Sequence, residues 1–198
     1  MNLLDTRLGD LLSQIGQSKP LISGSTASLI AGRLGVAMVR MALAVSSKHR
    51  ADNDLVIERL DLISARLLDA AEQDRAAALS LIEALRVGSA SVDRRRAITD
   101  ATLEPLTAAH LLVELLEHSV DSERGVEPSV ASDFFGGVEL ISGSFSGVMM
   151  AVESNLKQDA AADLRSRTLQ NRVELWARHN AAMAALRLRG RTAGFFSS

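Results

Sequence analysis

A long apolar segment that contains two glycines constrains the fold of this chain more than any other feature. It covers residues 27–45, and apolar side chains occupy nearly every side of the helix that it would form. Gly32 and Gly35 would each weaken an exposed helix by about 1 kcal/mol relative to alanine. Such a helix is stable when it is buried, so the segment predicts a central core helix. Two glycines three residues apart also let another backbone or a flat ligand come close.

A membrane span is the alternative interpretation of this segment, because about 20 residues are enough to cross a bilayer. Arg33 and Arg40 argue against it, since each would cost about 2.5 to 3.5 kcal/mol near the centre of an inserted helix. Aromatic residues do not flank the segment. We therefore expect a soluble protein without a membrane partner.

The composition favours an all-helical fold. Alanine and leucine dominate, three prolines interrupt 198 residues, and aromatic residues make up 3%. The formal net charge is −2, so no global field attracts nucleic acid. The chain has no cysteine, which excludes disulfides, thiolate metal ligands and cysteine nucleophiles. The N-terminus lacks the basic head and cleavage site of a signal peptide, so we expect a cytoplasmic protein.

Apolar residues at three- and four-residue steps predict the remaining helices. Amphipathic stripes favour helices over residues 2–16, 54–87, 93–120 and 159–188, and a second glycine-rich segment follows Ser132-Asp133. Pro105 should kink the helix that contains it. The predicted fold is an all-α, single-domain bundle of about five to six helices over residues 1–188, followed by a flexible tail over 189–198.

Two small clusters of polar residues could carry chemistry. His110, Glu114 and His118 share one helix face, but about 12 Å separates the outer two, too far for all three to hold one ion. Adjacent pairs could bind an ion, but the sequence offers no other ligand set, so we predict no metal site. Ser132 and Asp133 precede the second glycine-rich segment. Either residue can cap that helix, and an acid there can also transfer protons if a pocket raises its pKa. The sequence leaves both roles open.

These residues resemble the cyclodeaminase family, which comprises the C-terminal domain of formiminotransferase-cyclodeaminase and related bacterial methenyltetrahydrofolate cyclohydrolases. The family has a glycine-serine loop that leads into an Ala/Gly-rich helix, and later a Ser-Asp pair that opens a small-residue helix ending in Asn-Leu. The matching residues, within a resemblance over about 8–175, are Ile22-Ser23-Gly24-Ser25-Thr26, Ala31-Gly32-Arg33-Leu34-Gly35, Ser132-Asp133 and Asn155-Leu156. Pro105-Leu106 also falls where the family has a proline inside a helix, and Pro128 fits the loop before the Ser-Asp pair.

The resemblance implies a folate-dependent one-carbon enzyme, either a methenyltetrahydrofolate cyclohydrolase or a formiminotetrahydrofolate cyclodeaminase. A tetrahydrofolate derivative would be the substrate, and no cofactor would be tightly bound. The resemblance implies that Asp133 and Ser132 are the catalytic residues, with Asp133 transferring the proton and Ser132 orienting it. The implied substrate-binding residues are Ser23, Gly24, Ser25, Thr26, Asn155 and Lys157. Ser25 or Thr26 is also the expected N-cap of the first long helix.

A second hypothesis comes from a different class of protein. The chain departs from the family pattern at positions expected to line the folate pocket, among them Ile22, Ala44 and Ala151. The fold could therefore serve as a dimeric binding or scaffold protein, or act on another small molecule. Under either hypothesis the thin, apolar glycine-rich helices predict a homodimer.

Overall fold

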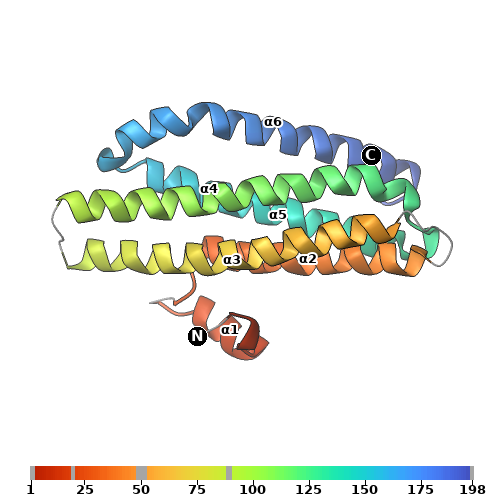
Figure 1. Ribbon diagram of the computed structural model, residues 1–198, viewed down its shortest axis with the longest axis horizontal. Helices are drawn as coiled ribbons and strands as arrows, with labels where there is room; N and C mark the ends of the chain where they lie inside the picture. The colour runs from red at the N-terminus through yellow and green to blue at the C-terminus, as the bar shows by residue number, and fades with distance from the viewer. Residues whose placement is uncertain (1–2, 19–20, 48–52, 88–90, 197–198) are drawn as a thin grey trace.

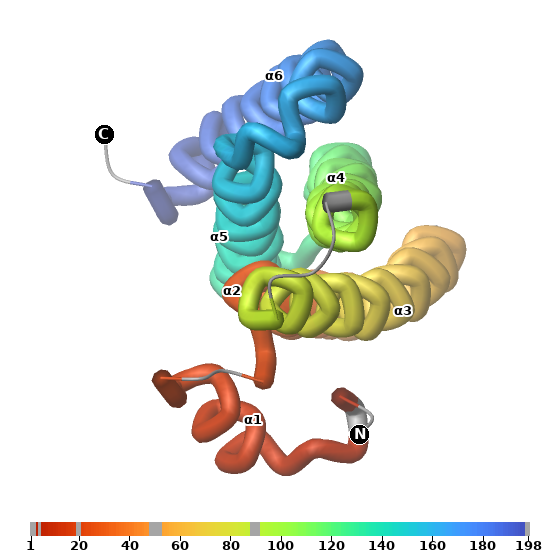
Figure 2. The backbone as a smooth tube through the Cα atoms, turned by 90° about the vertical axis from the view of Figure 1, so that its left-hand side faces the viewer, coloured from red at the N-terminus to blue at the C-terminus, as the bar shows by residue number. Residues whose placement is uncertain are grey.

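The computed structural model describes residues 3–18, 21–47, 53–87 and 91–196, and every regular element within these ranges is a helix. The α-helices are α1 (Leu8–Ile15), α2 (Gly24–Ser46), α3 (Asn53–Arg86), α4 (Ser91–Ser122), α5 (Ala131–Leu156) and α6 (Ala162–Thr192). Figures 1 and 2 show that the last five form an elongated bundle, whereas α1 lies outside it on the side of α2 and α3. The all-helical prediction is confirmed.

The two glycine-rich helices, α2 and α5, form the most extensive helix pair of the bundle. They run antiparallel, because Gly32 faces Ser144 whereas Gly35 faces Gly137. A Cβ atom added to Gly35 would lie 2.5 Å from the carbonyl oxygen of Gly137, so the two backbones touch there. The glycines thus serve the close packing that the sequence predicts.

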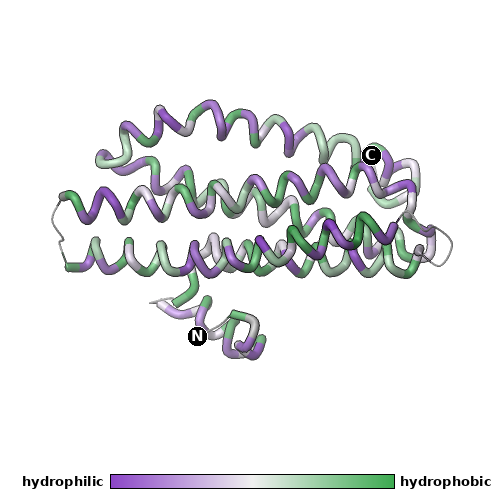
Figure 3. The backbone as a smooth tube through the Cα atoms, viewed as in Figure 1, coloured by the Kyte–Doolittle hydropathy of each residue, from purple (hydrophilic) through white to green (hydrophobic). Residues whose placement is uncertain are grey.

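The segments Gly24–Ser46 and Pro128–Leu156 are also long and apolar enough to cross a membrane by length and composition alone. In the structure they pack against each other, and Arg40 on α2 forms a bidentate ion pair with Asp61 on α3. One side of α2 nevertheless stays uncovered, with Leu34 58% exposed. Figure 3 shows that hydrophilic residues are frequent along α6, in contrast to α2 and α5.

Several helix ends differ from the prediction. Ser23, and neither Ser25 nor Thr26, is the N-cap of α2, and its hydroxyl accepts a hydrogen bond from the Thr26 N–H at 3.0 Å. The hydroxyls of Ser25 and Thr26 donate instead to the carboxylate of Asp74 on α3. Helix α5 begins at Ala131 without a side-chain cap, so Ser132 and Asp133 lie inside its first turn. Helix α4 contains Pro105 in its interior.

The described part of the C-terminal segment, residues 189–196, lies against the bundle. Helix α6 continues to Thr192, and the rings of Phe195 and Phe196 lie 5.5 and 5.7 Å from the ring of Phe135 on α5. Gly190 makes room for Phe196, because a Cβ there would overlap that ring. Packing of the Phe195 and Phe196 rings against Phe135 therefore holds the end of the described chain against α5.

Candidate functional site

A pocket of about 550 Å³ lies where the beginning of α2 meets the middle of α3 and the end of α5. Its two ends are polar, and its walls between them are mostly apolar. The lining residues are Ser23, Gly24, Ser25, Ser28, Asp74, Ala78, Leu81, Ile82, Ala101, Gly147, Met150, Ala151, Ser154 and Asn155. This volume lies within the range of pockets that bind small organic molecules, roughly 300 to 1,000 Å³.

The most unusual residue of this pocket is Asp74, a carboxylate that is only 1% exposed. Hydroxyl groups from the start of α2 surround it. Ser25 donates to both carboxylate oxygens at 2.9 Å, Thr26 donates to Oδ2 at 2.5 Å, and Ser23 lies 3.2 Å from Oδ2. We call Asp74 and these three hydroxyls the hydroxyl clamp. It joins α3 to the N-terminus of α2 through side chains about 50 residues apart in the chain.

Burial raises the pKa of the Asp74 carboxyl above its ordinary value, because desolvation penalises the charged form. The hydrogen bonds from Thr26, Ser25 and Ser23 oppose this shift, since they stabilise the carboxylate, but burial is the larger effect. A carboxyl group with a raised pKa can exchange a proton closer to neutral pH than an exposed aspartate can. Asp74 is therefore chemically suited to proton transfer.

The N-terminus of α2 adds hydrogen-bond donors beside this carboxyl group. The first backbone hydrogen bond of the helix runs from the Ala27 N–H to the Ser23 carbonyl, so the N–H groups of Gly24 and Ser25 precede it. Free N–H groups at a helix start, together with the helix dipole, favour anionic or electron-rich ligand atoms. A Cβ at Gly24 would contact nothing within 4 Å, so the approach to them is open.

Asn155 defines the other polar end of the pocket. Its amide nitrogen donates to the carbonyl oxygen of Ala101 at 2.7 Å, which fixes the side chain between α5 and α4. This bond uses one of the two N–H donors of the amide and leaves its oxygen to accept a hydrogen bond from a ligand N–H. The nearby Lys157 is exposed and does not line the pocket.

The structure separates Ser132 and Asp133 from this pocket within one chain. They lie near the start of α5, whereas Asn155 lies near its end, and 22 residues of helix span about 33 Å. Ser132 is exposed and Asp133 half-buried. The predicted catalytic pair and the predicted binding residue Asn155 are thus at opposite ends of the same helix.

Sequence reasoning missed Asp74, although a signal for it was present. Buried residues of α3 recur at helical spacing, including Leu67, Ala71 and Leu81, and Asp74 stands on the same stripe. An acid on an otherwise apolar stripe must be satisfied inside the protein. Three hydroxyl residues at the start of the preceding helix could have been recognised as its partners.

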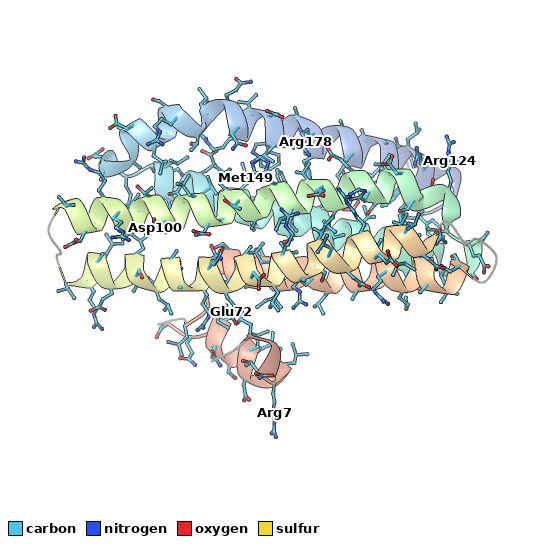
Figure 4. The ribbon with its side chains drawn as sticks, in the orientation of Figure 1. Arg7, Glu72, Asp100, Arg124, Met149 and Arg178 are labelled. Atoms are coloured by element: carbon cyan, nitrogen blue, oxygen red, sulfur yellow. The ribbon has the colours of Figure 1, made fainter. Side chains whose placement is uncertain are left out.

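Glu114 on α4 has basic neighbours. Its carboxylate lies 3.5 Å from Arg59, 3.8 Å from Arg66 and 3.7 Å from His118. Across the described ranges, no group of three or more His, Cys, Asp or Glu residues is arranged to hold a metal ion. Figure 4 labels Arg178 on α6, which forms a bidentate ion pair with Glu117 on α4.

Comparisons with known proteins agree with this architecture. Residues 7–174 match the family model described as formiminotransferase-cyclodeaminase. Among solved structures, the formiminotetrahydrofolate cyclodeaminase of Thermotoga maritima superposes with a TM-score of 0.85 at 17% sequence identity. The match covers 92% of this chain and 94% of that chain. A search of curated protein sequences finds no significant match.

Proposed function

Because this chain belongs to the formiminotransferase-cyclodeaminase family, we propose that its pocket binds a tetrahydrofolate derivative that carries a one-carbon group. The proposed reaction is cyclodeamination of a formimino group or hydrolysis of a methenyl bridge. The observation that carries this proposal is Asp74, a buried carboxyl group with a raised pKa at the wall of a pocket of suitable size. The proposed location is the cytoplasm.

Both reactions need one proton moved between nitrogen or oxygen atoms around a tetrahedral carbon. In cyclodeamination, folate N10 bonds to the carbon of the protonated formimino group (–CH=NH2+) held on N5. The N10 proton is transferred to the formimino nitrogen, and the bond from carbon to that nitrogen breaks to release ammonia and leave the positive charge on the methenyl bridge. In methenyl hydrolysis, water adds to the bridging carbon and loses both of its protons as the formyl carbonyl forms. One proton is taken up by the ring nitrogen N5 as its bond to carbon breaks, and the other is released to solvent. One carboxyl group can accept and return the proton in either case.

The pocket lining supports a flat, partly polar ligand. Ala78, Leu81 and Ala151 provide apolar walls for a ring system, while the Asn155 amide oxygen can accept from ring N–H groups. The N–H groups of Gly24 and Ser25 can donate to electron-rich ligand atoms near Asp74. No tightly bound cofactor is required by this chemistry.

The first test is a thermal-shift and calorimetric titration of the purified protein with formyl- and methenyltetrahydrofolate. At a ligand concentration 100 times Kd, binding adds about 2.7 kcal/mol to the free energy of unfolding. For a domain of this size that raises the midpoint by roughly 5 to 10 °C. Unchanged midpoints with every reduced folate at saturating concentration would refute the folate proposal.

The Asp74→Asn variant tests the role of the acid. It keeps the size of the side chain and a hydrogen-bond acceptor, so we expect folate binding to persist. Turnover of methenyl- or formiminotetrahydrofolate should fall by about 100-fold or more, as expected for loss of a proton-transfer group. Asp133→Asn serves as the comparison, and turnover unaffected by Asp74→Asn would refute the assignment.

A second candidate function keeps the fold without folate chemistry, as a binding or scaffold protein or one that acts on another small molecule. The observation that favours it is the hydroxyl clamp, because Ser23, Ser25 and Thr26 already satisfy Asp74 and stabilise the α2–α3 contact. Under this candidate, Asp74→Asn changes stability alone. A folded protein that binds none of the tested folates would favour it.

A further inference from the structure

The carboxylate of Asp74 lies behind other side chains at the pocket wall. Only 1% of this residue is exposed, and hydroxyl groups approach both of its oxygen atoms. Of the described residues that line the pocket, Asp74 alone has a titratable side chain. A proton that moves between this acid and a ligand must therefore pass through one of the groups that surround the carboxylate.

The three hydroxyls of the clamp differ in their access to the pocket. Thr26 is fully buried and does not line the pocket. Ser23 lines the pocket, but four polar atoms already lie within 3.2 Å of its hydroxyl oxygen, namely Ser25 Oγ, Thr26 Oγ1, the Thr26 backbone nitrogen and Asp74 Oδ2. A hydroxyl donates one hydrogen bond and accepts two, so the hydroxyl of Ser23 has no capacity left for a ligand.

Ser25 has the remaining open position. Its hydroxyl lines the pocket and lies 2.9 Å from both carboxylate oxygens of Asp74 and 2.9 Å from the Ser23 oxygen. The proton of this hydroxyl is directed to the carboxylate, and the contact with Ser23 uses at most one lone pair. The second lone pair of Ser25 can therefore accept a hydrogen bond from an N–H or O–H group of a ligand.

We propose that Ser25 is a catalytic residue that carries protons between the bound ligand and Asp74. In the forward step, an N–H or O–H bond of the ligand breaks as a new O–H bond forms on Ser25. The original O–H bond of Ser25 breaks in the same step, and its proton converts the Asp74 carboxylate to the neutral acid. The reverse transfer delivers a proton to the nitrogen whose bond to carbon then breaks. This inference rests on the proposed function, because it names the group that contacts the substrate in that reaction.

One hydroxyl is sufficient for both transfers. In the tetrahedral intermediate of either proposed reaction, the atom that loses the proton and the nitrogen that receives it are bonded to the same carbon. Two single bonds of ~1.45 Å place these atoms roughly 2.4 Å apart. The oxygen of Ser25 can therefore reach both atoms within hydrogen-bond distance without movement of α2.

The burial of Asp74 favours the return of the proton to the ligand. Desolvation raises the pKa of the Asp74 carboxyl, whereas the hydrogen bonds from Thr26, Ser25 and Ser23 lower it. These opposing effects keep both the charged and the neutral form of the acid accessible. Because the carboxyl group is shielded from solvent, a proton received through Ser25 can return to the ligand before it exchanges with water.

Two variants of the clamp distinguish a proton relay from a structural role. Ser25→Ala and Thr26→Val each remove one hydroxyl from Asp74, so a structural role predicts similar effects on turnover. A relay predicts that kcat for methenyl- or formiminotetrahydrofolate falls about 100-fold or more in Ser25→Ala, with little change in KM. In Thr26→Val the maximal kcat should fall by less than about tenfold. Its pH profile should move to higher pH, because the Thr26 hydrogen bond stabilises the carboxylate.

Two further variants are the controls. Ser25→Thr keeps a hydroxyl and should retain kcat within about tenfold of the wild type. Ser80→Ala repeats the serine-to-alanine change at an exposed position of α3 outside the pocket and should leave kcat unchanged. Circular dichroism and urea unfolding establish that each variant is folded. Wild-type kcat in Ser25→Ala, or an equal loss in Thr26→Val, would overturn the relay.

A double variant tests whether Ser25 and Asp74 act in one step. If the proton passes through both groups, Asp74→Asn combined with Ser25→Ala should be no slower than Asp74→Asn alone. Losses that multiply would mean that the two residues act separately and would overturn the relay. The wild type offers an independent measurement in mixtures of H2O and D2O. Its kcat should fall along a curve, because two protons move in one step, whereas a straight line would indicate a single proton and contradict the relay.

The same assays separate this inference from the proposed function. If the wild type turns over a reduced folate and Ser25→Ala does so equally well, the proposed function stands and the relay is wrong. If the wild type neither binds nor converts any reduced folate, the proposed function fails and the relay fails with it. Turnover by the wild type that is lost in Ser25→Ala and retained in Ser25→Thr supports both.

Discussion

The crossing of α2 and α5 predicts that alanine at Gly35 destabilises the protein, although alanine is the better helix former. A Cβ there would lie 2.5 Å from the Gly137 carbonyl oxygen and 3.0 Å from the Ile141 backbone nitrogen. Ordinary contacts begin near 3.4 Å, so the helices would have to separate locally by about 0.9 Å. Overpacking of this kind costs about 1 to 3 kcal/mol, toward the upper end where backbone atoms collide. The gain in helix propensity is about 1 kcal/mol, which leaves a net loss of about 2 kcal/mol.

Gly32→Ala is the matched comparison, because its Cβ would collide with a side chain. The nearest atom is the Ser144 hydroxyl oxygen at 2.6 Å, and this buried hydroxyl has no hydrogen-bond partner among the described residues. Ser144→Gly should therefore relieve Gly32→Ala but leave Gly35→Ala unchanged. The expected coupling energy is about 1 kcal/mol or more for the first pair and near zero for the second.

Urea unfolding of the three single variants and the two double variants measures these differences. A loss of 2 kcal/mol corresponds to a fall in Tm of roughly 4 to 8 °C for a chain of this length. A Gly35→Ala variant as stable as the wild type would refute the backbone contact. Equal rescue of both alanine variants by Ser144→Gly would refute the distinction between backbone and side-chain collisions.

Three further predictions concern pH and the C-terminal segment. Burial lowers the pKa of His179 below 6.5, so the unfolded chain binds this proton more readily than the folded chain does. The free energy of unfolding should therefore fall as the pH decreases through about 6.5. In a series of urea titrations at different pH, His179→Gln should flatten this part of the profile. The raised pKa of Asp74 has the opposite effect on stability, because the folded state binds this proton more tightly than the unfolded state does. The contribution of Asp74 to the free energy of unfolding should fall as the pH rises from 3.8 through the pKa of the folded state. Asp74→Asn should abolish this pH dependence in the same titration. Deletion of residues 193–198 uncovers Phe135 and should lower the free energy of unfolding by about 1 to 2 kcal/mol, whereas an unchanged thermal midpoint would contradict the aromatic contact.

Helical periodicity and glycine placement were sufficient to predict the fold. Gly32 and Gly35 indicated a close backbone approach, and the structure supplies Ser144 and Gly137 as the facing residues. The N-cap of α2 was assigned to the wrong hydroxyl residues, because Ser25 and Thr26 bind a carboxylate instead of a backbone N–H group. Competition of this kind depends on a residue about 50 positions away and is not visible in local sequence.

The candidate site was only partly predictable. Of the predicted substrate-binding residues, Ser23, Gly24, Ser25 and Asn155 line the pocket, whereas Thr26 and Lys157 do not. Asp74 was missed because it lies in the middle of a long helix, far from any motif. Asp133 was grouped with these residues because sequence motifs carry no distances, and a 26-residue helix separates its two ends widely.

The pairing of α2 with α5 also has a consequence for synthesis on the ribosome. Gly35 and Gly137 touch, yet 102 residues separate them in the chain. At roughly 5 to 20 residues per second, α2 leaves the ribosome about 5 to 20 s before its principal partner has been made. During this interval α3, the next helix, is the partner available to cover part of its apolar surface. Slower translation of the α3–α4 region should therefore prolong the exposure of α2 to chaperones and to aggregation.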